Sequence, residues 1–182
     1  DDMTIRKATL DDIPRIVEMA IRFLTETRYG TLLPPSPARL AAVAAQLITD
    51  FGVILVAEEE KSDAAARLAA AYPNPTLLLV GFIAIAAVEQ PLTGDLYGDE
   101  LAWWVEPEHR GSSLAYKLLW SAEDWARQKS LSVLKMVAPA GSSIGTIYER
   151  RGYILVESAY ALRVTLDEPI SISARGADGA AP

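Results

Sequence analysis

A short run of small residues, between an apolar stretch and a helix, is the part of the sequence best suited to chemistry. The apolar stretch is Leu101–Val105, and Arg110–Ala115 opens an amphipathic helix after a turn. Gly111, Ser112 and Ser113 put little side chain between the backbone and an approaching group, and the first N–H groups of a helix have no partner within it. Negative charge is stabilised at such a helix start. The run predicts a phosphate or pyrophosphate site.

Other reactive residues are scarce in the sequence. It has no cysteine, which excludes a thiol nucleophile, a disulfide and a thiolate metal site. Its single histidine, His109, cannot form a histidine metal cluster, has no G-x-S-x-G motif beside it, and is expected to face solvent in a loop. The acidic run Glu58–Glu60 is expected to be a solvated turn. The sequence therefore predicts no metal.

Composition narrows the class of partner. A formal net charge of -7 argues against nucleic acid, which needs a basic surface, and suits a cationic or neutral substrate better. The longest apolar run, Thr76–Val88, is shorter than the ~20 residues that span a bilayer, and no signal-peptide pattern is present. We expect a soluble, cytoplasmic protein without membrane or nucleic-acid partners.

Hydrophobic periodicity predicts the element order β-α-α-β-β-β-α-β-α-β-β in one α/β (α+β) domain spanning 3–166. The helix that follows the small-residue run is apolar at spacings of three and four, which predicts that it packs on a sheet. Asp11 is expected to cap the first helix and Ser36 the second. The predicted strands are Met3–Ala8, Val53–Ala57, Thr76–Val88, Leu101–Val105, Leu131–Ala138, Tyr153–Val156 and Tyr160–Leu166. Gly81 is expected at a bulge or close approach. The segment 61–75 is an alanine-rich insertion, and 167–182 is expected to be a disordered tail.

Two segments resemble motifs of the GNAT superfamily of acyl-CoA N-acyltransferases. Val105–Ala115 is similar to motif A, in which a strand leads into an R/Q-x-x-G-x-G/A loop that cradles the coenzyme A pyrophosphate. Arg110 and Ala115 match the first and last loop positions, and Ser113 stands at the usual middle glycine. Ile147–Tyr153 resembles the L-Y-E-K-x-G-F end of the family's last helix. The resemblance implies a mixed, mostly antiparallel sheet of six to seven strands, flanked by about four helices and splayed between strands 4 and 5.

The resemblance also implies roles for individual residues. Coenzyme A would lie between the splayed strands, with the Val105 N–H polarising the thioester carbonyl. Tyr148 matches the tyrosine that faces the coenzyme A sulfur as general acid in many relatives. The family asparagine that contacts the pantetheine is absent, and Ser142 and Ser143 occupy its neighbourhood. The residues predicted to bind the coenzyme are Trp104, Val105, Arg110, Gly111, Ser112, Ser113, Leu114, Ala115 and Ser143.

Transfer of an acyl group to an amine also requires a catalytic base, because an amine is mostly protonated at neutral pH. Glu100, at the head of the central strand, is the predicted base, with Asp99 as its substitute. Glu106 and Glu108 are expected to be exposed in the turn. Trp103 and Trp104 are neighbours in a strand, so they must point to opposite faces of it.

These observations predict an N-acetyltransferase that moves an acetyl group from acetyl-CoA to a primary amine by direct attack. The alternatives are a non-catalytic acyl-CoA-binding or regulatory module of the same fold, and a structural α/β domain without a cofactor. The acceptor would be a small-molecule or peptide amine: peptide N-termini, lysine side chains, polyamines, amino acids and aminoglycosides remain open. Tyr29 lies where relatives contact acceptors. Because dimers are common among GNAT proteins, the resemblance also leaves a homodimer open.

Overall fold

The computed structural model describes residues 3–59 and 78–164. They form one five-stranded mixed sheet in the order β1-β2-β3-β4-β5. The first four strands pair antiparallel and β5 joins β4 in parallel. The strands are β1 Met3–Lys7, β2 Gly52–Glu59, β3 Leu79–Glu89, β4 Leu96–Val105 and β5 Leu134–Lys135.

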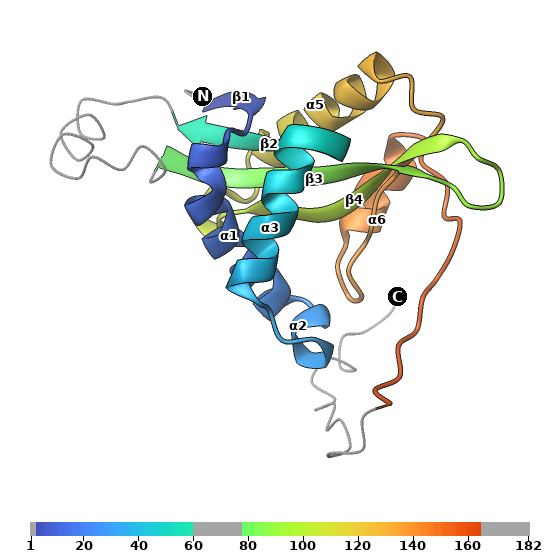
Figure 1. The fold of residues 1–182 in the computed structure, drawn as a ribbon, viewed down its shortest axis with the longest axis horizontal. Helices are drawn as coiled ribbons and strands as arrows, with labels where there is room; N and C mark the ends of the chain where they lie inside the picture. Colours follow the sequence, from blue (N-terminus) through green and yellow to red (C-terminus); the bar gives the residue numbers. More distant parts are fainter. Residues whose placement is uncertain (1–2, 60–77, 165–182) are drawn as a thin grey trace, which may run out of the picture.

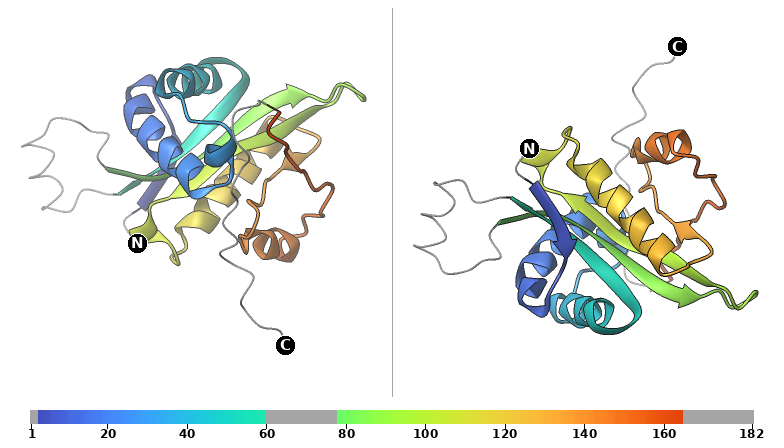
Figure 2. Two further views of the ribbon diagram at one scale, coloured as in Figure 1. Left: turned by 90° about the horizontal axis from the view of Figure 1, so that it is seen from below. Right: turned by 90° about the horizontal axis from the view of Figure 1, so that it is seen from above.

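Helices cover both faces of this sheet. In Figure 1, α1 and α3 lie in front of the strands and α5 behind them, and both views of Figure 2 keep this layering. The helices are α1 Ile13–Glu26, α2 Tyr29–Leu32, α3 Pro37–Gln46, α5 Leu114–Gln128 and α6 Ile144–Arg150, with a π-helical turn at Leu47–Phe51 and 3-10 turns at Leu10–Asp12 and Pro107–His109. No helix in the described ranges is long and apolar enough to cross a membrane.

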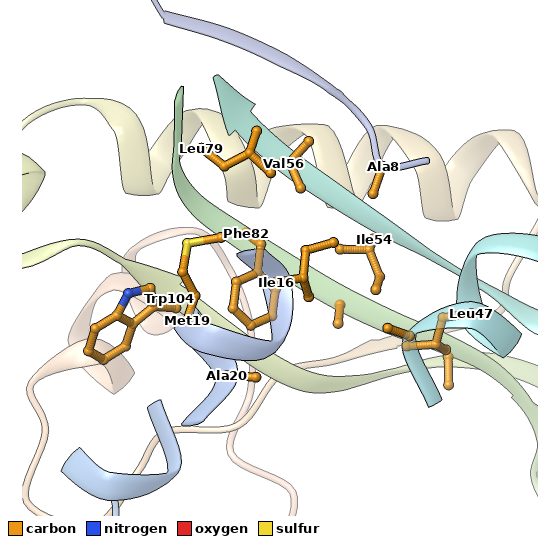
Figure 3. Packing of buried hydrophobic residues seen from close by; sticks show 13 residues of the cluster. Ala8, Ile16, Met19, Ala20, Leu47, Ile54, Val56, Leu79, Phe82 and Trp104 are labelled. Carbon is orange, nitrogen blue, oxygen red and sulfur yellow. The ribbon is translucent and has the colours of Figure 1, made fainter. Parts of the chain in front are cut away.

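Each face of the sheet has its own apolar core, because neighbouring residues of a strand point to opposite sides. Ile54 and Val56 of β2 pack beneath α1 and α3, together with the buried Phe82 (Figure 3). Val53 and Leu55 pack against α5 on the other side. β2 and β3 are thus buried on both faces, which explains why their sequences are apolar almost without a break.

Helix α1 begins one residue later than predicted. Asp12, and not Asp11, precedes the helix; its carboxylate accepts from the Thr9 N–H at 2.8 Å and pairs with Arg6 at 2.8 Å. Burial opposes ionisation of this carboxyl, but the bonds from Arg6 and Thr9 outweigh it, and the pKa of Asp12 is lowered. At α3 the prediction is confirmed: the Ser36 hydroxyl accepts from the Arg39 N–H at 3.3 Å.

The prediction of six to seven strands is wrong for the described residues, which form five. Residues 153–164 form no helix or strand, and the apolar side chains of Ile154, Tyr160 and Leu162 are exposed. The strand expected at 131–138 is reduced to Leu134–Lys135, so β5 offers only a very short edge for a further strand. Alternating apolar residues show that a strand can form, but not that a partner edge exists. Residues 61–75, 165–166 and 167–182 lie outside the described ranges.

Two further expectations can be compared with the structure. Instead of about four helices, the described residues contain five, because the short α2 was not predicted. Gly81 is a point of close approach, as expected: a Cβ there would lie 2.9 Å from the Trp104 carbonyl oxygen. The β2–β3 pairing also shifts register between Ala57 and Glu58, opposite Gly81.

Glu106 is buried, in contrast to the exposed position predicted for it. Only 1% of it is exposed, and its carboxylate pairs with Arg15 at 2.9 Å and Arg22 at 2.7 Å. Arg15 also donates to the Leu79 carbonyl at 3.2 Å. Both arginines belong to α1, so this ion pair network holds the helix to the ends of β3 and β4. Glu108, two residues on, is exposed as expected.

We expect Glu106→Gln to lower the free energy of unfolding by about 3 kcal/mol, because removal of one member of a buried ion pair leaves its partners uncompensated. Urea denaturation followed by circular dichroism measures the loss. Glu108→Gln, at the exposed position, is the matched control and should change stability by less than about 0.5 kcal/mol. Equal effects of the two variants would show that the network does not hold α1.

Candidate active site

The central strand β4 contains one extra residue. Ala102 pairs with Ala84 and Glu100 pairs with the next β3 residue, Ile85, which leaves Leu101 without a partner. Such a β-bulge reverses the alternation of side chains along the strand. Leu101 and Ala102 accordingly both line a cavity on the α1 and α3 side of the sheet.

β4 and β5 part after Asp99, two residues before the bulge residue Leu101. Their parallel pairing joins Gly98 to Leu134 and Asp99 to Lys135 and then stops. Two side chains hold Val137 beyond that point. The Glu100 carboxylate accepts from the Val137 N–H at 2.9 Å, and the Tyr148 hydroxyl donates to the Val137 carbonyl at 3.0 Å.

The environment of Glu100 favours its protonated form. Only 6% of the residue is exposed, and burial, with a smaller contribution from the Asp99 charge, raises its pKa to about 7 despite the Val137 N–H. Near neutral pH this carboxyl can therefore both accept and release a proton. Burial, opposed by Lys135, also raises the pKa of Asp99.

Tyr148 is buried on the α5 side of the sheet. Its ring lies 6.2 Å from that of Trp103 and 5.4 Å from that of Tyr153, centroid to centroid. Burial, and secondarily the charge of Glu100, raises its pKa above the ordinary value. The phenol is thus a neutral hydrogen-bond donor throughout the physiological pH range.

The small-residue run forms an open turn before α5. Gly111 has φ +81°, and a Cβ on it would meet nothing within 4 Å. The Ser112 hydroxyl donates to the His109 carbonyl at 2.7 Å and accepts from the Leu114 N–H at 3.2 Å. Ser113 is the N-cap residue of α5 and is exposed. The start of α5 is therefore accessible. His109 is half-buried in the 3-10 turn, whereas the sequence predicted that it faces solvent.

Arg110 is turned away from this opening and toward the sheet. Its guanidinium lies 4.5 Å from the centre of the Trp104 ring, donates to the Val105 carbonyl at 2.9 Å and pairs with Glu26 of α1 at 3.1 Å. These contacts fix the peptide that follows Val105. The prediction placed Arg110 in the anion loop by its position in the motif, and no pattern in the sequence signals its contact with Glu26.

Hydrogen bonding shows which main-chain groups of β4 face the gap. The Glu106 N–H donates to Val80 of β3 at 2.8 Å. Because bonded and non-bonded pairs alternate in an antiparallel ladder, the main chain of Trp104 also faces β3, whereas the N–H groups of Trp103 and Val105 face the β5 side. Of the two backbone positions predicted to meet the coenzyme, Val105 is the one turned to the gap.

The remaining predicted positions differ in burial and in the element that carries them. Trp103 and Trp104 pack in different cores, as expected from their opposite orientation. Both indole N–H groups are buried without a hydrogen-bond partner in the described part of the chain. Ala115 is half-buried in the first turn of α5, and Ser142 and Ser143 are exposed before α6.

Sequence reasoning missed Trp103 as a neighbour of Tyr148, and it also missed Val137. Nothing in the residue type of a valine within an apolar stretch signals that two polar side chains bind its backbone.

The fold and this gap define a class: an α+β domain whose mixed sheet opens between its fourth and fifth strands, with an accessible helix start nearby. Residues 37–153 match the model of the acetyltransferase (GNAT) family. Because the match covers more than half of the sequence, the chain belongs to the GNAT acetyltransferase family. Comparison with curated proteins gives no match.

Solved structures share the fold. A predicted acetyltransferase with acetyl-CoA from Clostridium acetobutylicum has a TM-score of 0.64 at 21% identity, covering 88% of this chain and 95% of that one. A ribosomal-protein-alanine N-acetyltransferase from Brucella melitensis biovar Abortus 2308 has a TM-score of 0.60 at 20% identity, with 88% and 98% covered. An aminoglycoside N-acetyltransferase in complex with CoA has a TM-score of 0.63 at 13% identity, with 88% and 93% covered.

Burial of Glu100 has a measurable consequence for stability. Its pKa is about 7 in the folded protein against 4.5 ordinarily, so between these pH values the folded protein binds more protons than the unfolded chain, and the free energy of unfolding falls as pH rises. Glu100→Gln removes this dependence while keeping an acceptor for Val137. We expect the stability of the variant relative to the parent to rise by about 3 kcal/mol between pH 4.5 and 8.

Urea denaturation at a series of pH values tests this expectation. Glu149→Gln, on the exposed surface of α6, is the control and should run parallel to the parent at every pH. A constant difference between Glu100→Gln and the parent across the range would mean that Glu100 is ionised in the folded protein with its ordinary pKa.

Proposed function

We propose that this protein transfers an acetyl group from acetyl-CoA to a primary amine by direct attack of the amine on the thioester. The observation that carries the proposal is the gap between β4 and β5, with the exposed start of α5 near its mouth. Similar folds are described in complex with acetyl-CoA and with CoA, which supports the choice of acyl donor.

The start of α5 would hold the pyrophosphate of the donor. Backbone N–H groups and the helix dipole attract the negative charge, and Gly111, Ser112 and Ser113 leave room for it. The pantetheine would then run along the β4 edge, where the Trp103 and Val105 N–H groups are turned toward the gap. Hydrogen bonding from Val105 to the thioester oxygen stabilises the oxyanion that forms on attack. Arg110, bonded to the Val105 carbonyl, positions this part of the strand.

Glu100 is the proposed base. Before the attack the ammonium form of the amine loses one proton, which Glu100 takes directly or through a water molecule. The neutral nitrogen then bonds to the carbonyl carbon, and the second proton leaves it for the departing thiolate or the solvent. A carboxyl with a pKa of about 7 is suited to this role, because it is substantially ionised at neutral pH and is a stronger base than an ordinary carboxylate.

Tyr148 is proposed to stabilise the departing thiolate. When the carbon–sulfur bond breaks, the electron pair stays on sulfur, and a phenol O–H can donate a hydrogen bond to it. The raised pKa disfavours a stable phenolate, so the stabilisation comes mainly from that hydrogen bond. Donation to the sulfur would replace the present bond to the Val137 carbonyl.

A non-catalytic acyl-CoA-binding module is the second candidate. It is favoured by Ser113 in place of the usual glycine and by the absence of the asparagine expected near Ser143. Both functions predict binding of acetyl-CoA, and only the first predicts its turnover.

Binding and turnover can be separated with the purified protein. We expect acetyl-CoA to raise the melting temperature, and we expect free thiol to appear when mixed primary amines are added. Ser113→Glu should weaken acetyl-CoA binding by at least about 30-fold, since a carboxylate would stand against the pyrophosphate at the helix start. Gln128→Glu adds the same charge at the other end of α5 and should leave binding unchanged.

Each outcome has a distinct meaning for these assignments. Stabilisation without thiol release would favour the binding module. Unaltered binding by Ser113→Glu would place the pyrophosphate elsewhere.

The role of Tyr148 is tested by Tyr148→Phe. Removing the donor to the thiolate should lower kcat by about 100-fold while the affinity for acetyl-CoA changes less than about twofold. Tyr153→Phe is the matched control, because its hydroxyl bonds to Glu123 and not to Val137. The kcat values are measured by thiol release at saturating acetyl-CoA. Equal kcat values for Tyr148→Phe and the parent would show that Tyr148 does not stabilise the thiolate.

A further inference from the structure

A cleft on the α1 and α3 side of the sheet reaches Leu101, the residue that follows Glu100 in β4. Its volume is about 340 Å³. Its wall is formed by the end of α1, by α2 and the segment that joins it to α3, by the start of α3 and by Leu101 of β4. Its volume is within the usual range for small-molecule sites. Leu101 is the bulge residue and is adjacent in sequence to Glu100, so the cleft meets the central strand where β4 leaves β5.

A smaller cavity of about 110 Å³ adjoins the cleft beneath α1 and α3. The two share part of their walls, namely Phe23, Leu24, Leu40 and Leu101. The rest of the smaller cavity is lined by apolar side chains of the core. An apolar group that entered the cleft could therefore extend toward this second space without meeting a polar side chain.

The wall of the cleft carries a single ionised group. Besides its leucine, phenylalanine and proline residues, it contains Tyr29, Ser36 and Arg39, and no carboxylate among the described residues lines it. In residues 3–59 and 78–164, no hydrogen bond or ion pair engages the Arg39 guanidinium; only its backbone N–H is bonded, to Ser36. Arg39 is exposed, and its unpaired guanidinium is open to a carboxylate, which it can bind through two parallel hydrogen bonds.

We infer that this cleft binds the acceptor and selects a primary amine that carries both an apolar group and a carboxylate, as an amino acid or a short peptide does. The inference rests on the proposed function. The carboxylate pairs with Arg39, the apolar group occupies the region shared by the two cavities, and the amine is directed to the gap beside Leu101. A polycation such as an aminoglycoside would meet Arg39 and find no carboxylate among the described residues of the wall, although several similar structures are aminoglycoside acetyltransferases.

The test compares amines that differ in one feature. Phenylalanine and phenethylamine share an apolar group, and only the first has a carboxylate; leucyl-leucine and its C-terminal amide form a second pair. Glycine has the carboxylate without the apolar group, and kanamycin is the polycation. With acetyl-CoA saturating, thiol release should give a kcat/KM at least tenfold higher for the carboxylate member of at least one pair, and lower values for glycine and kanamycin.

Substitution of Arg39 shows whether the guanidinium causes the preference. Arg39→Gln should reduce kcat/KM at least tenfold for the preferred carboxylate amine and less than threefold for its carboxylate-free partner. Arg39→Glu should bring kanamycin closer to, or above, that amine. Arg28→Gln is the matched control, because Arg28 is an exposed arginine next to α2 that does not line the cleft.

The outcomes distinguish this inference from the proposed function. Thiol release that is no faster with the carboxylate member in both pairs, or that is fastest with kanamycin, or equal loss for both members of the preferred pair in Arg39→Gln, would overturn the inference and leave the transferase intact. If no amine releases thiol, the proposed function fails. Calorimetric binding of the same panel to the CoA-loaded protein then tests whether the cleft selects a carboxylate. Carboxylate-selective binding that depends on Arg39 would support the cleft assignment, and its absence would overturn it.

Discussion

The early end of the β4–β5 pairing is the constraint on which the site depends. Two residue pairs join the strands, and beyond them the Val137 N–H is bonded to the Glu100 side chain and not to a neighbouring strand. The carboxylate thus satisfies a half-buried amide that a continued sheet would have satisfied. The same bond partly offsets the cost of burying Glu100. One interaction thus keeps the sheet open and places a carboxyl with a raised pKa beside the opening.

Much of the fold follows from local pattern. The run at 110–115 was located from residue size and helix periodicity, and α3 starts at its predicted cap because Ser36 and Pro37 are local signals. Long-range facts could not be predicted in this way. Burial of Glu106 depends on two arginines more than 80 residues away in the sequence. The two final strands were predicted from alternation alone, and the β5 edge beside which they would pair is only Leu134–Lys135.

The total charge of the chain and the charge on the wall of the cleft differ in sign. A net charge of -7 favours a cationic or neutral substrate, but several carboxylates are already paired with arginines, among them Asp12, Glu26, Glu106 and Glu123. What a ligand meets is set by the groups left unpaired where it binds. In the cleft that group is Arg39, which is why the acceptor that we infer carries a carboxylate.

The bulge at Leu101 has a consequence for the main chain as well as for side chains. The Gly98 N–H donates toward β5, to Val133, whereas the Glu106 N–H donates toward β3, to Val80, each at 2.8 Å. In a regular strand, two residues separated by an even number of positions would send their amides to the same side. The extra residue reverses that order, and because of it the amide of Val105 faces the gap and not β3. A single inserted residue therefore aims the proposed oxyanion donor at the gap, allows the Glu100 side chain to reach β5, and brings Leu101 to the wall of the cleft.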